Sequence, residues 1–180
     1  YAKDETLLSK SSSGAIFPVL AAEIIRRGGL VFGASFDKYF NVVHTAVETI
    51  SEFSSLCSSK YVQSRIESEC YFQVKTALKA GRWVYFSGMP CQVAALKSYL
   101  GKEYEKLITQ DTVCHSVPSP IVWKDYAVAL EKQYGGRLTD FSFRNKASGW
   151  ESYHIRAEFD NGGEFRQTAA ENSYQRGFLK

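Results

Sequence analysis

The spacing of hydrophobic residues along the 180-residue chain predicts alternating helices and strands. One face of a helix returns every 3.6 residues, whereas the side chains of a strand alternate between two faces. Apolar residues at helical spacing predict helices at residues 15–27, 69–80, 91–100 and 120–134. Short runs rich in β-branched and aromatic residues predict strands at residues 30–36, 41–47, 82–86, 107–114, 138–143, 153–159 and 164–168.

This order of elements predicts an α/β fold with a mixed sheet and flanking helices, followed by a C-terminal antiparallel β-meander. The link at residues 37–40 is short and favours antiparallel pairing of the strands on either side of it. The sequence DNGG at residues 160–163 is typical of a hairpin turn. We therefore divide the chain into an α/β portion, residues 1–136, and a β-meander extension, residues 137–180.

The composition is that of a globular protein, with 44% hydrophobic and 23% charged residues, and it excludes a disordered tail, a coiled coil and a collagen-like fibre. A net charge of +3 argues against binding nucleic acid through a basic patch. The longest apolar run, residues 15–22, contains Pro18 and is much shorter than the roughly 20 residues of a membrane span. Because no secretion signal is present, we expect a cytoplasmic location. The chain begins at Tyr1 without Met, so we expect a piece of a longer protein.

The four cysteines are expected to be reduced thiols, because the chain is rich in apolar residues and carries no secretion signal. They are Cys57, Cys70, Cys91 and Cys114, and none forms a Cys-x-x-Cys pair with another. A self-contained zinc site or a complete iron–sulfur site is therefore not encoded in these residues. Cys57 and Cys70 lie in or near predicted helices, and we expect both to be inert.

The sharpest local signal is the sequence VYFSGMPCQ at residues 84–92, which predicts a buried strand, a glycine turn and the start of a helix. The first N–H groups of a helix have no helical acceptors and carry the positive end of its dipole, so they favour a phosphate or a thiolate. Cys91 would lie in this first turn, where the pKa of a thiol can fall below about 8.5. It is a candidate metal ligand, redox thiol or nucleophile; the alternative is a small apolar residue that packs the junction.

A second group of polar residues, DTVCH at residues 111–115, precedes a proline-rich loop. If strand 107–114 pairs beside strand 82–86, both carboxyl ends open on the edge where α/β sheets bind ligands. Cys114 and His115 would then approach Cys91. The alternatives are a Cys114 buried in the sheet and a His115 bonded to backbone. His44 and His154 are expected to be structural.

Three further segments carry candidate anion-binding groups. Lys60 could hold a phosphate as a point charge and Tyr61 could stack on a ring, although a solvated lysine beside a packed tyrosine is the simpler alternative. Residues 11–14 (SSSG) could cradle a phosphate at a helix start, or act only as a cap. Arg144, beside Lys146, lies in a basic and aromatic turn that could contact an anion or simply face solvent.

Four separated strings together resemble the beta-subunit family of coenzyme F-420 hydrogenases and dehydrogenases. They are SSKYVQS at 58–64, GMPCQVAALK at 88–97, DTVCHSVPSP at 111–120, and FRNK at 143–146 with Gly149 and Trp150. The likeness runs from about residue 11 to residue 180, and four motifs in order are more specific than any one alone. The resemblance implies an electron-transfer oxidoreductase that passes electrons between iron–sulfur clusters, FAD and a hydride donor or acceptor.

The resemblance also implies cofactors, partners and site residues. The cofactors are FAD and a 4Fe-4S cluster, the cluster only in a longer protein, because cysteines that flank this segment in relatives are absent here. The partners are a redox protein or ferredoxin-like domain, and a deazaflavin or other small hydride carrier. The implied metal ligands are Cys91 and Cys114, and the catalytic residues stay unassigned. The implied cofactor-binding residues are Ser13, Gly14, Lys60, Tyr61, Gln63, Ser87, Gly88, Met89, Pro90, Gln92, Asp111, His115 and Arg144.

Three residues near the implied site depart from the family pattern. Met89 stands where Thr is usual, Ser116 stands where Gly is usual, and Ala15 stands where a second Gly commonly follows the serine. We therefore expect the cofactor contacts at these positions to differ from those of relatives. The extension at residues 137–180 is expected to begin the next region of the family.

Other functions fit parts of the sequence. A Pro-Cys-Gln string also occurs in cytosine-5 DNA methyltransferases, but no Gly-rich cofactor loop precedes it here and the net charge is small. A thiol-dependent transferase with Cys91 as nucleophile is a better alternative, and alkylation of Cys91 should then abolish turnover without flavin or iron. A cofactor-free interaction domain is the non-enzymatic alternative, and it predicts no flavin absorbance.

Overall fold

The computed structural model describes residues 1–147, 149 and 152–178. Its helices are α1 (Glu5–Lys10), α2 (Ile16–Arg26), α3 (Ile50–Phe53), the 3-10 helix η1 (Ser54–Leu56), α4 (Ser68–Lys79), α5 (Pro90–Leu100), α6 (Pro120–Tyr134) and α7 (Ser173–Phe178). Its strands are β1 (Leu30–Phe36), β2 (Val42–Val47), β3 (Val84–Gly88), β4 (Leu107–Asp111), β5 (Leu138–Asn145), β6 (His154–Phe159) and β7 (Glu164–Thr168). Within this part of the chain, every helix is too short or too polar to traverse a lipid bilayer.

The first sheet has the strand order β2-β1-β3-β4 and mixes both kinds of pairing. Strands β1 and β2 pair antiparallel across the short hairpin, as their spacing predicts. Strands β1 and β3, and then β3 and β4, pair parallel through crossovers that contain α4 and α5. The predicted mixed sheet is confirmed, and so is the expectation that the strand before Cys91 lies beside the strand before Cys114.

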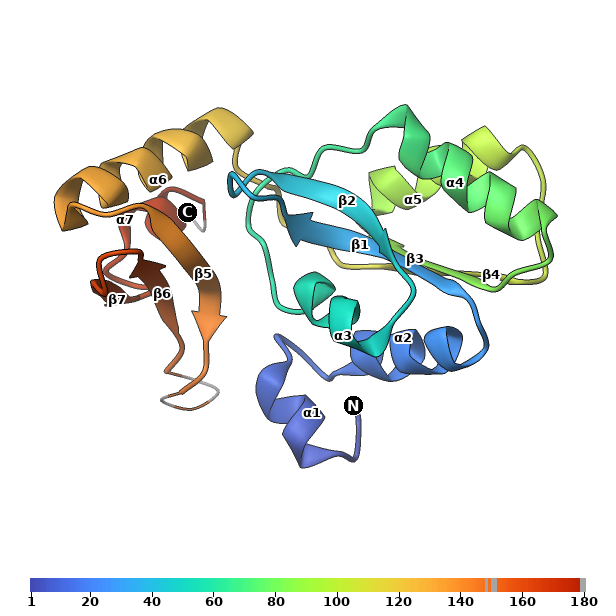
Figure 1. Ribbon diagram of the computed structural model, residues 1–180, viewed down its shortest axis with the longest axis horizontal. Helices are drawn as coiled ribbons and strands as arrows, with labels where there is room; N and C mark the ends of the chain where they lie inside the picture. Colours follow the sequence, from blue (N-terminus) through green and yellow to red (C-terminus); the bar gives the residue numbers. More distant parts are fainter. Residues whose placement is uncertain (148, 150–151, 179–180) are drawn as a thin grey trace.

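Helices cover both faces of this sheet (Figure 1). Successive side chains of a strand point to opposite faces, so Phe32 and Phe86 pack against α4 and α5, whereas Val31 and Tyr85 pack against α2. All four of these residues are fully buried. The near-continuous apolar sequences of β1 and β3 follow from this burial on both sides.

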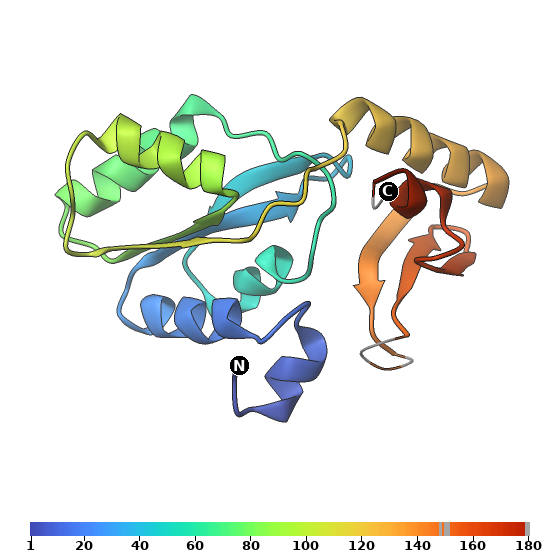
Figure 2. The same cartoon turned by 180° about the vertical axis from the view of Figure 1, so that it is seen from behind.

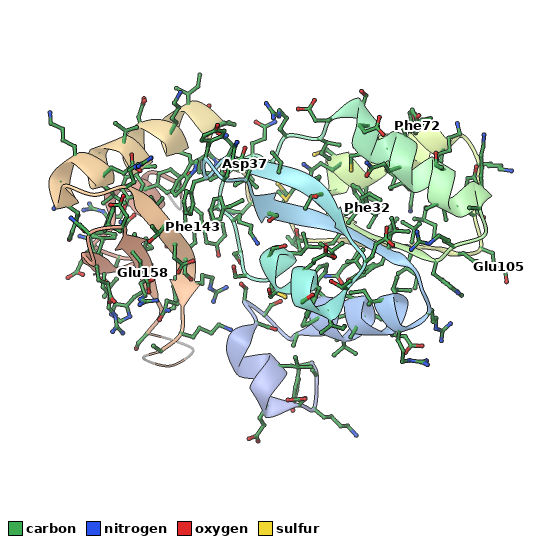
Figure 3. All side chains as sticks on the ribbon, in the orientation of Figure 1. Phe32, Asp37, Phe72, Glu105, Phe143 and Glu158 are labelled. Atoms are coloured by element: carbon green, nitrogen blue, oxygen red, sulfur yellow. The ribbon has the colours of Figure 1, made fainter. Side chains whose placement is uncertain are left out.

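A second, antiparallel sheet of order β5-β6-β7 forms the C-terminal part, as the meander pattern predicts. Helix α6 packs Trp123 and Leu130 into the apolar core of this sheet. The β1–β2 hairpin reaches the same core, because the Trp123 indole Nε1 donates to the Phe40 carbonyl at 2.6 Å. Figure 2 shows α6 along one side of this sheet, and Figure 3 places Asp37 at the tip of the hairpin, toward the C-terminal part. The hairpin therefore joins the two sheets.

The structure corrects two expectations about elements. Strand β4 ends at Asp111 rather than at Cys114, because residues 112–119 form an irregular loop with Ser116 at a positive φ. The helices α1, α3 and α7 and the helix η1 were not predicted. Each spans six residues or fewer, which is too short for a helical repeat of apolar positions to stand out.

Candidate functional site

A cavity of about 650 Å³ lies where the carboxyl ends of β3 and β4 reach the edge of the first sheet. Its walls come from most residues of the segments 11–18, 56–64, 87–92 and 110–117, with Gly33, Ala34 and His44 added from β1 and β2 and Arg144 from the second sheet. Its volume falls in the range of about 300–1,000 Å³ that is typical of pockets for cofactor-sized ligands. The topology thus places a cofactor-sized pocket at the edge where open α/β sheets bind ligands.

Most of the residues that the sequence nominated line this cavity. They are Ser13, Lys60, Tyr61, Gln63, Ser87, Gly88, Met89, Gln92, His115 and Arg144, together with Cys91 and Cys114. Gly14, Pro90 and Asp111 are not among the described lining residues. Pro90 is the first residue of α5, Asp111 is the exposed last residue of β4, and a Cβ on Gly14 would lie 3.1 Å from the Tyr1 Cβ. The nominated motifs therefore converge, although their roles in binding stay predictions.

Cys91 and Cys114 both carry exposed free thiols at the wall of the cavity. Cys91 lies in the first turn of α5, as predicted, and Cys114 lies in the loop after β4. The alternatives of a Cys91 packed into the junction and a Cys114 buried in the sheet are wrong, because both residues face solvent. His115 is likewise exposed in the same loop. Both thiols are open to reagents and ligands.

A closed set of hydrogen bonds holds the turn between β3 and α5. His44 Nε2 lies 3.0 Å from the Ser87 carbonyl oxygen, and His44 Nδ1 lies 2.9 Å from Ser64 Oγ. Gln92 Nε2 donates to Ser64 Oγ at 2.8 Å, and Gln92 Oε1 accepts from the Met89 N–H at 2.8 Å. Side chains from three segments thus fix the backbone from which Cys91 projects.

Lys60 is held at the cavity wall by two carbonyl groups. Its Nζ donates to the carbonyl oxygens of Ser55 at 2.8 Å and Cys57 at 2.7 Å. Burial lowers the pKa of the Lys60 ammonium to about 8, and the Cys57 thiol opposes this shift. The neighbouring Tyr61 ring packs edge-on against Phe143 at 5.6 Å. The lysine is therefore not a freely solvated side chain, in contrast to the simpler alternative.

Arg144 extends from β5 into the cavity wall. Its guanidinium stacks on the Tyr153 ring, 4.5 Å from the centroid, and its Nε is buried without a hydrogen-bond partner among the described residues. A buried, unpartnered donor costs free energy unless a ligand or water satisfies it. Lys146, the residue after β5, donates from Nζ to the Ser11 carbonyl. This bond joins the second sheet to the cavity-lining segment at residues 11–18. Trp150, the aromatic residue of this motif, lies outside the described residues.

The charge of the lining favours an anion. Lys60 and Arg144 supply positive charge, and the described lining contains no aspartate or glutamate. Hydroxyl groups of serines and amide groups of glutamines provide neutral hydrogen-bond partners, and Phe17, Val62 and Met89 provide apolar surface. An aromatic ligand that carries phosphate would match this combination of charge, polarity and apolar contact.

Two of the departures from the family pattern occupy positive φ angles. Ala15, at the start of α2, has φ 59°, and Ser116, in the loop after β4, has φ 118°. Glycine adopts such angles without the steric cost that a Cβ brings, which explains why the resemblance expects glycine at both positions. Both residues line the cavity. The local backbone thus keeps a glycine-like conformation although the residues have changed.

Ser116→Gly is expected to raise the free energy of unfolding by about 1 kcal/mol, because it removes the strain of a non-glycine residue at positive φ. Chemical denaturation of both proteins measures the difference. Ser119→Gly, in the same loop, is the matched control. Its φ is −63° and its Oγ accepts from the Ile121 N–H as a helix cap, so this change should destabilise by a few tenths of a kcal/mol. A Ser116→Gly protein less stable than the original would contradict the strain argument.

Sequence reasoning missed several residues of the site. His44 was expected to be structural, yet it is a cavity-lining residue as well as a buried one, and Gln110 and Cys57 also line the wall. Burial raises the pKa of the Cys57 thiol, which keeps this cysteine protonated and agrees with its expected inertness. No local motif marks His44, since its partners Ser64 and Ser87 come from distant segments.

The described residues do not form a metal centre by themselves. No group of three or more His, Cys, Asp or Glu side chains within them is arranged to hold a metal ion. Cys91 and Cys114 share a cavity, but two thiols are fewer than the four ligands that an iron–sulfur cluster needs. The implied metal role of these cysteines therefore lacks a complete ligand set in this part of the chain.

Comparison with protein-family models and with curated proteins gives no match. Among solved structures, the fold is similar to a chain of the F420-reducing NiFe hydrogenase complex from Methanosarcina barkeri, with a TM-score of 0.57 and 15% sequence identity. The alignment covers 98% of this chain and 60% of the hydrogenase chain, so this chain spans about three fifths of that protein's length. At this identity the likeness establishes a shared fold, one that occurs in a redox enzyme complex.

Proposed function

We propose that this chain is the flavin-binding portion of an electron-transfer oxidoreductase of the coenzyme F-420 hydrogenase and dehydrogenase beta-subunit type. The observation that carries the proposal is the convergence of four motifs, distant in sequence, on one cavity with two cations and no described carboxylate. The fold shared with a hydrogenase-complex chain agrees with a redox role. FAD is the ligand that we assign to the cavity.

The residues at the wall fit the chemistry of a flavin nucleotide. Arg144 offers an unpartnered donor and Lys60 an ammonium, and both would hold phosphate oxygens. The start of α5 adds the N–H group of Cys91, because Pro90 has no N–H and those of Met89, Gln92 and Val93 already donate to Gln92 Oε1 or to the Met89 carbonyl. Apolar side chains such as Phe17 and Met89 would exclude water from the ring. A bound flavin would supply the exchange between hydride and single-electron transfer, while the protein supplies position and a shielded pocket.

An iron–sulfur cluster is not assigned to the described residues, because they lack a set of three or more suitable ligands. In the proposal, any cluster in contact with Cys91 or Cys114 takes its remaining ligands from another segment or another protein. A redox protein, or a ferredoxin-like domain, is the proposed electron-transfer partner. A deazaflavin or another small hydride carrier is the proposed exchange partner of the flavin.

The absorbance spectrum of the anaerobically purified protein tests the proposal. We expect flavin bands that bleach when dithionite is added and return on oxidation. Heat denaturation should release FAD, which chromatography identifies. A protein that carries no flavin, and that takes up none when FAD is added during purification, would contradict the proposal.

A thiol-dependent transferase is the second candidate function, and the exposed Cys91 thiol in the first turn of α5 favours it. The two functions predict different results when the Cys91 thiol is blocked or replaced. In the transferase, blocking Cys91 with iodoacetamide abolishes turnover in a protein free of flavin and iron. In the flavoprotein, Cys91→Ser keeps FAD bound. Retention of FAD in this variant would therefore separate the oxidoreductase from the transferase.

Lys60→Gln is expected to weaken FAD binding about tenfold, because a charge-assisted hydrogen bond to phosphate is lost. The sign of the pH effect follows from the pKa of about 8. The ammonium is present below pH 8 and is lost as the pH rises through this value, so the affinity of the original protein should fall there. Titration of FAD at pH 6.5, 7.5 and 8.5 measures the effect, and Lys60→Gln should lack the fall.

Lys38→Gln is the matched control for this charge. Lys38 lies over the Tyr39 ring on the β1–β2 hairpin and does not line the described cavity. Its FAD affinity should match that of the original protein at each pH. Equal affinities for the original protein and Lys60→Gln would remove Lys60 from the proposed phosphate site.

A further inference from the structure

Four hydrogen bonds connect the Met89 N–H to the Ser87 carbonyl through Gln92, Ser64 and His44, and all four donate in the same direction along this path. The Ser87 carbonyl can only accept, so the proton of a neutral His44 ring lies on Nε2. Nδ1 is then an acceptor, and the Ser64 hydroxyl donates to it. The amide NH2 of Gln92 can only donate, and it uses the lone pairs of Ser64 Oγ. Gln92 Oε1 is left to accept from the Met89 N–H. Each of these four hydrogen bonds therefore pairs a donor with an acceptor.

Both ends of this chain of hydrogen bonds lie on the backbone of one turn. It leaves the turn at the Ser87 carbonyl and returns at the Met89 N–H, having passed through β2 and the segment at residues 57–67. Gly88 lies between the two ends, and a Cβ there would approach the Gln92 Oε1 to 3.1 Å. The Gln92 backbone carbonyl also accepts from the Tyr71 hydroxyl at 3.1 Å. The turn is therefore clamped from several sides.

We propose that His44 is a positioning residue, which as its Nε2–H tautomer clamps the turn Ser87–Met89 through Ser64 and Gln92 and thereby sets the affinity of the adjoining cavity for its ligand. The statement about affinity depends on the proposed flavin site. The clamp itself depends only on the hydrogen bonds. His44 acts on the ligand through the turn, because Ser87, Gly88 and Met89 line the cavity together with Cys91 and Gln92 of α5.

The surroundings of His44 favour the neutral ring that this clamp needs. The imidazole stacks on Phe86 with ring centroids 5.3 Å apart, and the residue is 8% exposed. Burial lowers the pKa of His44, and the Ser87 hydrogen bond opposes that shift. Arg65 and Glu67, which follow Ser64 in the sequence, form an ion pair with each other, with Arg65 Nε 2.6 Å from Glu67 Oε1. The titratable or charged side chains that share the described cavity lining with His44 are Lys60, Tyr61, Arg144, His115, Cys57, Cys91 and Cys114.

Gln92→Glu tests the direction in which these hydrogen bonds donate. A carboxylate still accepts from the Met89 N–H but cannot donate to Ser64, so the hydroxyl turns toward it and His44 Nδ1 loses its donor. A negative charge near the ring also favours imidazolium, so the pKa of His44 should rise by about one unit. Histidine NMR titration measures this pKa, and imidazole nitrogen shifts report the tautomer. Gln63→Glu is the charge control, because it places a carboxylate at the same cavity without joining the chain.

The expected NMR result is an Nε2–H tautomer for His44 in the original protein and a larger rise of its pKa in Gln92→Glu than in Gln63→Glu. An Nδ1–H tautomer, or equal rises in the two variants, would overturn the clamp. This measurement needs no flavin. It therefore decides the clamp even if the original protein binds no FAD, an outcome that would defeat the proposed function alone.

Ser64 variants test the link to the ligand. Ser64→Ala removes one donor and one acceptor from the chain, and we expect about a fivefold loss of FAD affinity, as for one hydrogen bond. Ser64→Thr keeps the hydroxyl and should restore the original affinity. The melting temperature of each variant is measured in parallel, so that unfolding is not mistaken for weak binding. A folded Ser64→Ala protein with unchanged FAD affinity would overturn the positioning role of His44.

Discussion

Trp123→Ala is expected to lower the free energy of unfolding by about 3–5 kcal/mol, the range for truncating a buried tryptophan. Trp123 is 2% exposed, and its ring contacts Phe36 of the first sheet and Phe141 and Phe143 of the second. The same change leaves the Phe40 carbonyl without its indole donor. Urea denaturation followed by circular dichroism measures the loss.

Phe72→Ala is the matched control for this substitution. Phe72 is 54% exposed on α4, so its removal should change the free energy of unfolding by less than about 1 kcal/mol. Trp123→Phe is a second comparison, because it retains an aromatic ring but not the donor to Phe40. The free energy of unfolding of Trp123→Phe should fall by an amount between those of Trp123→Ala and Phe72→Ala. A Trp123→Ala protein as stable as Phe72→Ala would show that the hairpin does not join the two sheets.

Arg144→Ala is expected to weaken FAD binding about 10- to 100-fold, because hydrogen bonds to charged groups contribute about 1.5–3 kcal/mol. Its Nε is buried without a partner among the described residues, and the stack on Tyr153 fixes the plane of the guanidinium. Arg144→Lys keeps the charge but loses the planar donor pair, so its affinity should be intermediate. Fluorescence titration of FAD measures all three proteins.

Arg137→Ala is the control for this second prediction. Arg137 precedes the same strand, β5, and its side chain is 89% exposed and pairs with Asp160. Its removal should leave FAD affinity unchanged. If Arg144→Ala and Arg137→Ala bound FAD equally well, the charge of the cavity would not explain ligand binding.

The periodicity of apolar residues predicted the longer helices and strands, because each of these elements packs against another regular element along its length. The alternation of Val31 and Phe32 in β1 reflects two helical layers that cover both faces of the sheet. The sequence allowed β3 and β4 to be neighbours, and their parallel pairing brings the Cys91 and Cys114 motifs to one edge. Short helices such as α3 fell below the length at which a periodic pattern shows.

The sequence could not reveal contacts that tertiary structure alone creates. His44 has partners 20 and 43 residues away, and no local spacing connects them. The length of β4 was overestimated, because the apolar Val113 continues the strand pattern in the sequence but is fully exposed in a loop. Arg144 was nominated from its motif, but its buried Nε and its stack on Tyr153 depend on how the second sheet meets the first.

Titration of the purified protein with FAD, FMN and riboflavin tests the central claim most directly, because the three ligands share a ring and differ in phosphate. The charge of the cavity predicts that FAD and FMN bind in a one-to-one ratio and more tightly than riboflavin. It also predicts that Arg144→Ala removes most of this difference. Failure to bind any of the three, or equal affinity for riboflavin and the phosphorylated flavins, would contradict the account.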